Sequence, residues 1–279
     1  MPLKRVLAIV LWFLLLAVHV TATAQTITEL QNADKLRIKT WIEPQENIIA
    51  KQQLNLYIEI ATDKWFSGGI RIGRFEVKDA IVLQREKFAV NSTRTEGDKS
   101  WTVQMWTLVI YPQREGAFEI PTIPLRLSIA GENLESIVGD TNTQPLSFST
   151  QIPEALQNKT GWIATTRFEV DESFNKSLDE LKPGDALIRT ISMSADNMPA
   201  MMLPKVAAEK LQGIALYQKP PQVTDKVNRG DYLAQRTEVF TYVFEKPGYY
   251  QLPAQTFYWW NLESQSLESI VLSAQTLKV

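Results

Sequence analysis

Apolar and polar residues alternate with a period of two over short segments along most of the chain. Residues 54–61 follow this pattern closely, and residues 186–195 follow it more loosely. Because every second side chain of a half-buried strand faces the core, both segments are expected to form β-strands. Residues 36–42 and 166–170 precede them as candidate first strands. With almost no helical periodicity elsewhere, the pattern predicts an all-β fold.

Two short motifs occur twice in the same relative positions. The pentapeptide LESIV stands at residues 134–138 and again at residues 267–271, 133 residues later. A Gly-x-aromatic-x-aliphatic-Pro motif begins at Gly116 and again at Gly248, 132 residues later. One repeated pentapeptide is weak evidence, but two motifs in a common register indicate a duplicated structural unit.

The Gly-x-aromatic motif resembles the corner that leads into strand F of immunoglobulin-like sandwiches, where a tyrosine hydroxyl bonds back to the upstream backbone. Gly248 and Tyr250 are the candidate corner residues of the second unit. Gly116 and Phe118 are those of the first, where the missing hydroxyl leaves packing alone to hold the corner. We therefore expect two tandem immunoglobulin-like β-sandwich domains, each ending with LESIV as its strand G.

The N-terminal segment has the layout of a secretory signal peptide. Lys4 and Arg5 precede an apolar run at residues 6–18, and an Ala-x-Ala sequence ends at Ala24. The run is shorter than the roughly 20 residues of a membrane span, which favours cleavage over retention. The expected organisation is a signal peptide at 1–24, a first domain at 28–150, a linker at 151–161 and a second domain at 162–279.

Composition removes several kinds of chemistry. The chain contains no cysteine, and its one histidine, His19, lies inside the expected signal peptide. Histidine-dependent and thiol-dependent catalysis, and zinc sites with His or Cys ligands, are therefore excluded for residues 25–279. These residues hold 27 basic and 31 acidic side chains, which gives no indication of nucleic-acid binding. We expect no enzyme activity, no catalytic residues, no cofactor, no metal site and no small-molecule substrate.

The strongest candidate for a binding surface is the aromatic pair Tyr258 and Trp260. Alternation along the strand places this pair on one face, with Phe257 and Trp259 on the other. Exposed aromatic pairs are common at protein interfaces and on sugar-binding platforms. The pair therefore indicates a partner-binding surface or, alternatively, an envelope glycan-binding module. Burial of both faces by the neighbouring domain is an equally good interpretation.

Two further features have structural and functional interpretations. Met198, Met201 and Met202 could offer thioether ligands to Cu(I), although methionines that fill gaps at the end of a sandwich are the better interpretation. Arg189 lies among apolar neighbours on an expected strand, which indicates a buried ion pair.

The order of motifs along the chain resembles that of the BatD family, the oxygen-tolerance proteins of bacterial envelopes. The resemblance rests on YPQREGAFEIPTI, KPGDALIRTI, MMLPKV, GIALYQKPPQVTD and EKPGYYQLPAQTFYWWN, and it extends over residues 36–279. It implies a non-enzymatic, exported scaffold of immunoglobulin-like domains in the periplasm. Its implied partners are von Willebrand factor A-domain proteins of a system with a MoxR-type ATPase. Members commonly continue into a transmembrane helix, so this chain resembles a short form. Three alternatives stay open: a soluble periplasmic form, a form held at the inner membrane through partners or an uncleaved signal segment, and a truncated product.

Overall fold

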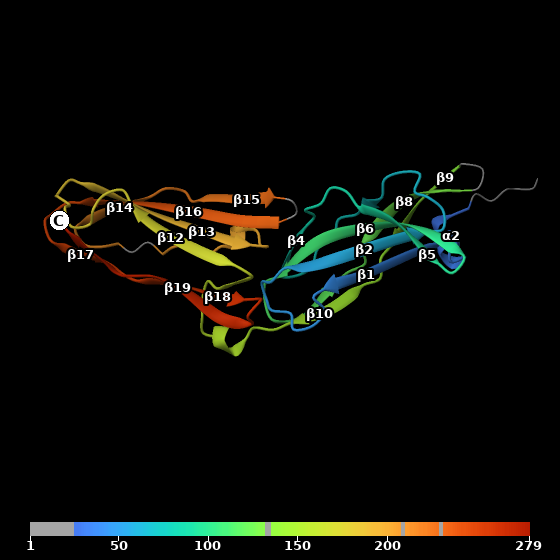
Figure 1. Cartoon of the computed structure of the whole chain (residues 1–279), viewed down its shortest axis with the longest axis horizontal. Coiled ribbons are helices and arrows are strands. Elements are labelled where there is room, and N and C mark those ends of the chain that lie inside the picture. The colour runs from blue at the N-terminus through green and yellow to red at the C-terminus, as the bar shows by residue number, and fades with distance from the viewer. Residues whose placement is uncertain (1–24, 132–134, 208–209, 229–230) are drawn as a thin grey trace, which may run out of the picture.

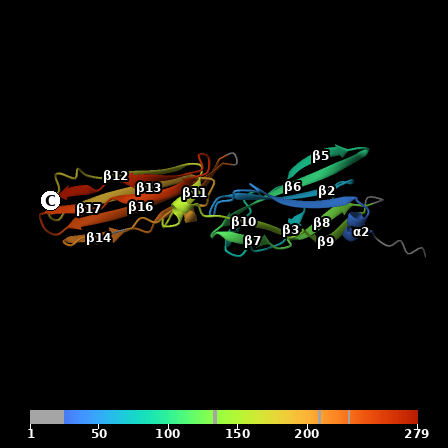
Figure 2. The ribbon, with the colours of Figure 1, turned by 90° about the horizontal axis from the view of Figure 1, so that it is seen from below.

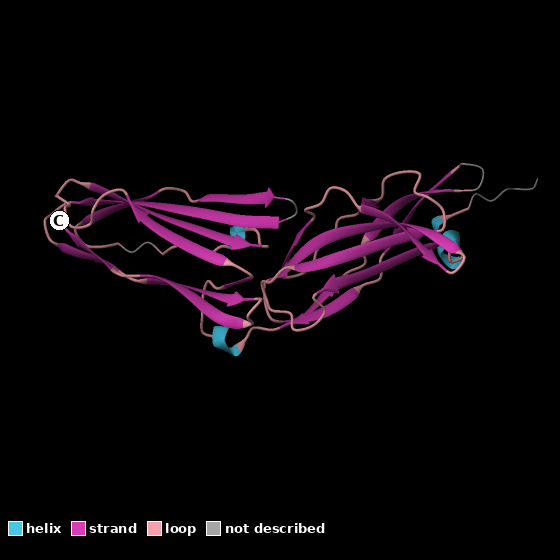
Figure 3. Ribbon diagram, in the orientation of Figure 1, coloured by secondary structure: helices cyan, strands magenta, loops and turns pink. Residues whose placement is uncertain are grey.

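The computed structural model describes residues 25–131, 135–207, 210–228 and 231–279. The expected signal peptide lies outside these residues. The described chain is all-β, with strands throughout and only three short helical segments (Figure 3). These segments are α2 (Ile27–Asn32), η2 (Glu154–Leu156) and η3 (Ala200–Met202). The expected all-β class is confirmed.

The strands form two groups, which lie end to end along the molecule and are called here the first and second lobes (Figure 1). The first lobe contains β1 (Leu36–Glu43), β2 (Leu54–Thr62), β3 (Arg71–Ile72), β4 (Ala80–Leu83), β5 (Val90–Glu96), β6 (Lys99–Pro112), β7 (Gly116–Ile120), β8 (Pro124–Ala130), β9 (Ser136–Asn142) and β10 (Leu146–Thr150). The second lobe contains β11 (Ile163–Thr165), β12 (Phe168–Phe174), β13 (Ala186–Asp196), β14 (Ile214–Gln218), β15 (Gln222–Asn228), β16 (Asp231–Phe244), β17 (Tyr249–Leu252), β18 (Gln255–Asn261), β19 (Ser266–Leu272) and β20 (Gln275–Lys278).

The large sheets of the two lobes share one strand order. The large sheet of the first lobe has the order β1-β2-β6-β4, and β5 also pairs with β6. The large sheet of the second lobe has the order β12-β13-β16-β14, and β15 also pairs with β16. Opposite the large sheet of the first lobe lie the pairs β7–β10 and β8–β9. The corresponding pairs of the second lobe are β17–β20 and β18–β19. This correspondence confirms the internal repeat inferred from LESIV.

Each lobe has its own apolar core between its sheets. In β2, alternate residues from Leu54 to Ile60 are completely buried, as their sequence pattern predicts. They pack with Phe118, Leu127 and Phe148 from the opposite sheets. The second lobe repeats this arrangement with residues of β13, β16, β17 and β18.

The assignment of LESIV to the last strand of each unit is wrong. The second copy lies in β19, and β20 follows it and pairs with β17. In the first unit β9 begins at Ser136 and is followed by β10, which pairs with β7. The segments 146–150 and 275–278 are too short to show a strong alternation, and long-range pairing with the corner strands defines them.

Helix α2 was not predicted from the sequence, although its start signal is present. The Thr26 hydroxyl accepts a hydrogen bond from the Glu29 backbone N–H at 3.2 Å, and the Glu29 carboxylate accepts one from the Thr26 backbone N–H at 2.8 Å. This reciprocal capping box stabilises a short helix that buries Ile27 and Leu30. Six residues are too few for a periodic pattern to stand out.

Candidate interaction surfaces

The aromatic pair Tyr258 and Trp260 is half-buried and packs against the linker. Strand β18 turns Phe257 and Trp259 into the core of the second lobe. Tyr258 and Trp260, on its other face, pack on a small cluster called here the linker patch: Ile49, Ala50, Leu156, Trp162 and Ala164. The ammonium group of Lys159 lies 4.3 Å from the centre of the Tyr258 ring. Much of the pair is therefore occupied by contacts within the chain.

The two corners, at Tyr250 and at Phe118, are held by different interactions: a hydrogen bond in the second lobe and ring packing in the first. The Tyr250 hydroxyl donates a hydrogen bond to the backbone carbonyl of Lys246 at 2.9 Å. Phe118 stacks on Phe148, with ring centres 5.1 Å apart, and the Arg114 guanidinium covers it at 4.3 Å. Gly116 has a φ of +97°, which a residue with a side chain adopts only with strain. Gly248 precedes β17, and its backbone N–H donates to the Val279 carbonyl.

The lobes meet through a polar network called here the junction, made of Gln53, Arg85, Tyr111, Asn197 and Tyr232. The Tyr111 hydroxyl accepts a hydrogen bond from the Arg85 guanidinium and lies 2.8 Å from Gln53 Oε1 and 3.0 Å from the Asn197 carbonyl oxygen. The Arg85 guanidinium also stacks over the Tyr232 ring at 3.5 Å. Because Asn197 and Tyr232 belong to the second lobe, this network joins the two lobes.

Burial changes the ionisation of two side chains where the lobes meet. Removal from water raises the pKa of Tyr111 well above its usual range, so its hydroxyl remains a neutral hydrogen-bonding group. Lys51 donates to the Trp162 carbonyl at 2.8 Å, and its ammonium group lies 4.1 Å from the Trp162 ring centre. Burial lowers the pKa of Lys51.

A cavity of about 570 Å³ lies beside the junction, with walls from both lobes and the linker. Most of its side chains are uncharged carboxamides, and Glu46 is its one charged residue. The lining residues are Pro44, Glu46, Asn47, Gln52, Gln53, Gln151, Leu262 and Gln265. Carboxamides both donate and accept hydrogen bonds, so this surface suits a polar, uncharged ligand group such as a peptide main chain.

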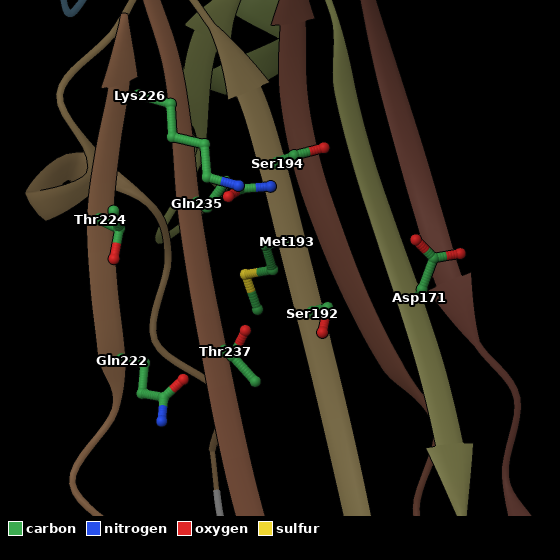
Figure 4. A pocket seen from close by; sticks show the side chains of 9 residues that line it. All are labelled: Asp171, Ser192, Met193, Ser194, Gln222, Thr224, Lys226, Gln235 and Thr237. Carbon is green, nitrogen blue, oxygen red and sulfur yellow. The ribbon is translucent and has the colours of Figure 1, made fainter.

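A second, smaller groove of about 350 Å³ lies on the large sheet of the second lobe (Figure 4). Its lining side chains come from β12, β13, β15 and β16 and are mostly hydroxyls and carboxamides: Asp171, Ser192, Met193, Ser194, Gln222, Thr224, Lys226, Gln235 and Thr237. The Met193 side chain does not face the groove, because it is buried in the core on the other side of the sheet. Asp171 and Lys226 are the only charged groups in this groove.

The core of the second lobe contains charged residues. Arg189 donates a hydrogen bond to the Glu172 carboxylate at 2.6 Å, which is the buried ion pair expected from the sequence. Arg236 forms a second pair with Glu238 at 2.6 Å, and the Gln218 amide donates to the same carboxylate group. These pairs satisfy most of the buried charge.

The described residues contain no cluster of three or more His, Cys, Asp or Glu that could hold a metal ion. The three methionines lie in different surroundings: Met198 is completely buried, Met201 is 68% exposed, and Met202 lies at the edge of the second core. This distribution favours the packing interpretation over a copper site. No helix within the described ranges is long and apolar enough to span a membrane.

Comparison with protein families gives one match, and it covers the first lobe. Residues 14–158 match the family model of the TRAPPC10 C-terminal domain. The chain belongs to the TRAPPC10 C-terminal domain family. No match was found among curated proteins. The matched segment begins inside residues 1–24, continues through all ten strands of the first lobe and ends just after η2.

Membership of the TRAPPC10 C-terminal domain family overturns the resemblance to BatD. The expected role in oxygen tolerance, the MoxR-linked von Willebrand factor A-domain partners and the periplasmic location are wrong with it, as is the alternative of an envelope glycan-binding module. The motifs behind the resemblance lie in β6–β7, β13, η3, β14–β15 and β17–β18, where most of them encode strands and corners. Such motifs reflect how a β-lobe is built, and proteins with unrelated functions can contain them.

The TRAPPC10 family match covers only one of the two repeated lobes. The second lobe lies beyond residue 158, yet its large sheet has the strand order of the matched lobe. The junction joins the matched lobe to this second copy, and the short repeated motifs give no sign of it. Its members Arg85, Tyr111 and Tyr232 carry no local signal in the sequence, because they are distant in the chain and meet only in the fold.

Proposed function

We propose that this chain is a non-enzymatic component of a trafficking complex. The observation that carries the proposal is the match of residues 14–158 to the TRAPPC10 C-terminal domain. In this role the partners are other subunits of the TRAPP complex, and the site of action is the cytosol or the Golgi membrane surface.

Within this proposal, each lobe is an immunoglobulin-like domain, with bounds at residues 28–150 and 162–279 and a linker at 151–161. The hydrogen bond from the Tyr250 hydroxyl to the Lys246 carbonyl supports the assignment for the second lobe, because such a corner is typical of immunoglobulin-like sandwiches. The first lobe has the same strand order around Phe118.

The accessible edges of Tyr258 and Trp260, together with the linker patch, form the proposed contact for a partner subunit. Two observations support this choice. Both rings are only half-buried, and the buried indole N–H of Trp260 has no hydrogen-bond partner in the described part of the chain. Half-buried aromatic side chains at the meeting point of two lobes offer a partner a large apolar area at little cost in conformational entropy.

The test is reconstitution with purified TRAPP subunits, followed by size-exclusion chromatography. The chain is expected to co-elute with the subunits, and Tyr258→Lys is expected to weaken binding by about tenfold or more. Phe88→Lys is the matched control, because Phe88 is 83% exposed on the first lobe and is not among the residues that form or pack against the linker patch. Failure of the unaltered chain to bind any TRAPP subunit would refute the function. Equal loss with Phe88→Lys would refute the assigned surface.

A further inference from the structure

The internal repeat allows surfaces of the two lobes to be compared position by position. The Lys51 N–H donates to the Pro112 carbonyl in the first lobe, as the Gly184 N–H does to the Phe244 carbonyl in the second. The Gln113 N–H donates to the Asp79 carbonyl, as the Glu245 N–H does to the Gly213 carbonyl. These equivalent bonds align β4 with β14 and β6 with β16.

In the first lobe, the surface formed by β4 and β6 holds the neighbouring lobe. Val109 and Tyr111 on β6 are 5% and 0% exposed, and they belong to the core cluster of the second lobe. Ile81 and Leu83 on β4 pack against the same cluster and pair with Tyr111 and Val109 in the sheet. This surface is therefore a binding surface for the end of a β-lobe.

The second lobe carries the equivalent surface, and there no neighbouring lobe packs on it within the described residues. Ala215 pairs with Val243 and Tyr217 with Thr241, at the positions that Ile81, Tyr111, Leu83 and Val109 occupy in the first lobe. We call these four residues of the second lobe the end surface. Tyr217 is 63% exposed. Strand β14 lies at the end of the molecule that is remote from the first lobe, near the C-terminus (Figure 1).

Lys219 completes the correspondence. It lies two residues after Tyr217, as Arg85 lies two residues after Leu83, and it is exposed. In the first lobe the cation of Arg85 lies over the Tyr232 ring of the bound lobe. The end surface therefore offers an aromatic side chain, apolar groups and a cation, as the first-lobe surface does, with the aromatic residue at the position of Leu83 instead of that of Tyr111.

We propose that the end surface binds the first lobe of a second copy of this chain, head to tail. The part of the second lobe that covers the first-lobe surface includes Asn197, which directly precedes Met198 after β13. The Asp63 N–H donates to the Lys35 carbonyl in the first lobe, as the Asp196 N–H does to the Arg167 carbonyl in the second. Two residues further along, Trp65 of the first lobe therefore stands at the position of Met198. Trp65 is 53% exposed and provides an apolar group for the end surface.

Charge complementarity favours the same occupant. The turn between β5 and β6 lies at the same end of the first lobe and carries an exposed Asp98 (Figure 2). The carboxylate of Asp98 is a suitable partner for the Lys219 ammonium group. A head-to-tail contact uses two different surfaces, so each copy retains one open surface, and dimers extend to longer chains as the concentration rises.

Analytical ultracentrifugation of the purified chain over a range of concentrations tests the proposal. The unaltered chain is expected to self-associate, and Tyr217→Asp or Trp65→Asp alone is expected to weaken association by about tenfold or more. Phe88→Asp, on an exposed side chain outside both surfaces, is expected to leave association unchanged. Unchanged thermal unfolding of each variant establishes that the fold is intact, and Tyr217→Ser or Trp65→Ser replaces the Asp variant at the same position if that variant fails this criterion.

A mixture of the two variants distinguishes head-to-tail contact from any symmetric dimer. Each variant retains the surface that the other has lost, so an equimolar mixture is expected to form a 1:1 heterodimer that does not extend further. A chain that stays monomeric at all concentrations would overturn the proposal, as would a mixture that stays monomeric. Loss of TRAPP-subunit binding by Tyr217→Asp, without any self-association of the unaltered chain, would also overturn it by assigning the surface to a different partner.

Discussion

The hydroxyl of Tyr250 is a single group whose contribution can be measured directly. It donates to the Lys246 carbonyl at 2.9 Å, and Tyr250→Phe removes this bond while keeping the ring against Phe244. We expect the free energy of unfolding to fall by about 1 kcal/mol in urea denaturation. Tyr249→Phe is the control, because that ring is 76% exposed, and it is expected to change stability by less than about 0.5 kcal/mol. An equal effect of both substitutions would show that the bond does not hold the corner.

Asp34 is the carboxylate whose titration is most strongly changed by its neighbours. Hydrogen bonds from Arg37, at 2.6 Å and 2.7 Å, lower its pKa from 3.8 to about 2, with a smaller contribution from Lys99. Because the folded pKa is depressed, the stabilisation is fully present above pH 3.8 and is lost as the pH falls through about 2. An NMR titration of the Asp34 carboxyl carbon is expected to show the low midpoint, and Arg37→Ala is expected to return it toward 3.8. An unshifted midpoint in the unaltered chain would contradict the ion pair.

At the residue scale, the sequence predicts the bonds of single side chains better than it predicts which distant residues cover them. Tyr250 and Arg189 have the bonds that their neighbours in the sequence suggest, because a corner motif and a strand pattern are local signals. The environment of Tyr258 and Trp260 was left open between a free surface and a covered one. The linker patch that half-covers them comes from residues 49, 50, 156, 162 and 164, which no local pattern connects to β18.

At the scale of elements, β12, β13 and β16 contain charges where the first lobe has none. Strand register places Glu172, Arg189, Arg236 and Glu238 at positions equivalent to Thr40, Leu56, Gln104 and Trp106. Because the first lobe forms the same sheets without these charges, the topology does not require them. Buried ion pairs generally contribute little net stability compared with apolar residues of similar size.

Substitution in one ion pair tests this comparison. Arg189→Leu leaves the Glu172 carboxylate unpaired, with its side chain only 11% exposed, and is expected to destabilise the chain by about 3 to 5 kcal/mol. Adding Glu172→Thr recreates the first-lobe pair of residues and is expected to recover most of that loss in urea denaturation. Arg126→Leu is the control, because the pair of Arg126 with Asp140 is exposed, and we expect a change of less than about 1 kcal/mol. A double variant as unstable as the single one would contradict this reasoning.

Long strands were predictable from the sequence and short ones were not. Strands β2, β6, β13 and β16 are long and alternate or are rich in β-branched and aromatic residues, so their existence could be predicted. Strands β3 and β11 have two and three residues, and β10 and β20 have five and four. Pairing across the lobe determines these short strands, and a local pattern of so few residues cannot specify it.

At the scale of the whole molecule, the Tyr111 hydroxyl joins the two lobes. Tyr111→Phe leaves the Arg85 guanidinium without this acceptor and removes the one O–H that can donate to Gln53 Oε1 or the Asn197 carbonyl, and we expect a loss of about 1 to 3 kcal/mol at the junction. Hydrogen exchange is expected to accelerate around residues 51–55 and 196–203 and to stay unchanged in β19. Tyr57→Phe is the control, since its hydroxyl takes part only in a 3.5 Å contact with Asn55. Uniform acceleration across the chain would indicate general destabilisation instead of a local junction.

The whole chain was assigned to the wrong family from its sequence because its motifs describe β-lobes. Corner residues such as Gly116 and Gly248 recur wherever strands turn in this way, so their order along the chain reports architecture and not partners. The match of residues 14–158 to the TRAPPC10 C-terminal domain compares many positions at once, including the first lobe's short strands. Function at this scale depends on what the assembled surface binds.

Competition for the TRAPP complex tests the central claim most directly. A chain that belongs to the TRAPPC10 C-terminal domain family and acts as a trafficking-complex component is expected to bind purified TRAPP subunits at the place that this domain occupies. Fluorescence anisotropy of a labelled TRAPPC10 C-terminal domain on those subunits gives the measurement. We predict that the unlabelled chain displaces the domain in a concentration-dependent manner. No displacement at saturating concentrations of the chain would contradict the proposed function.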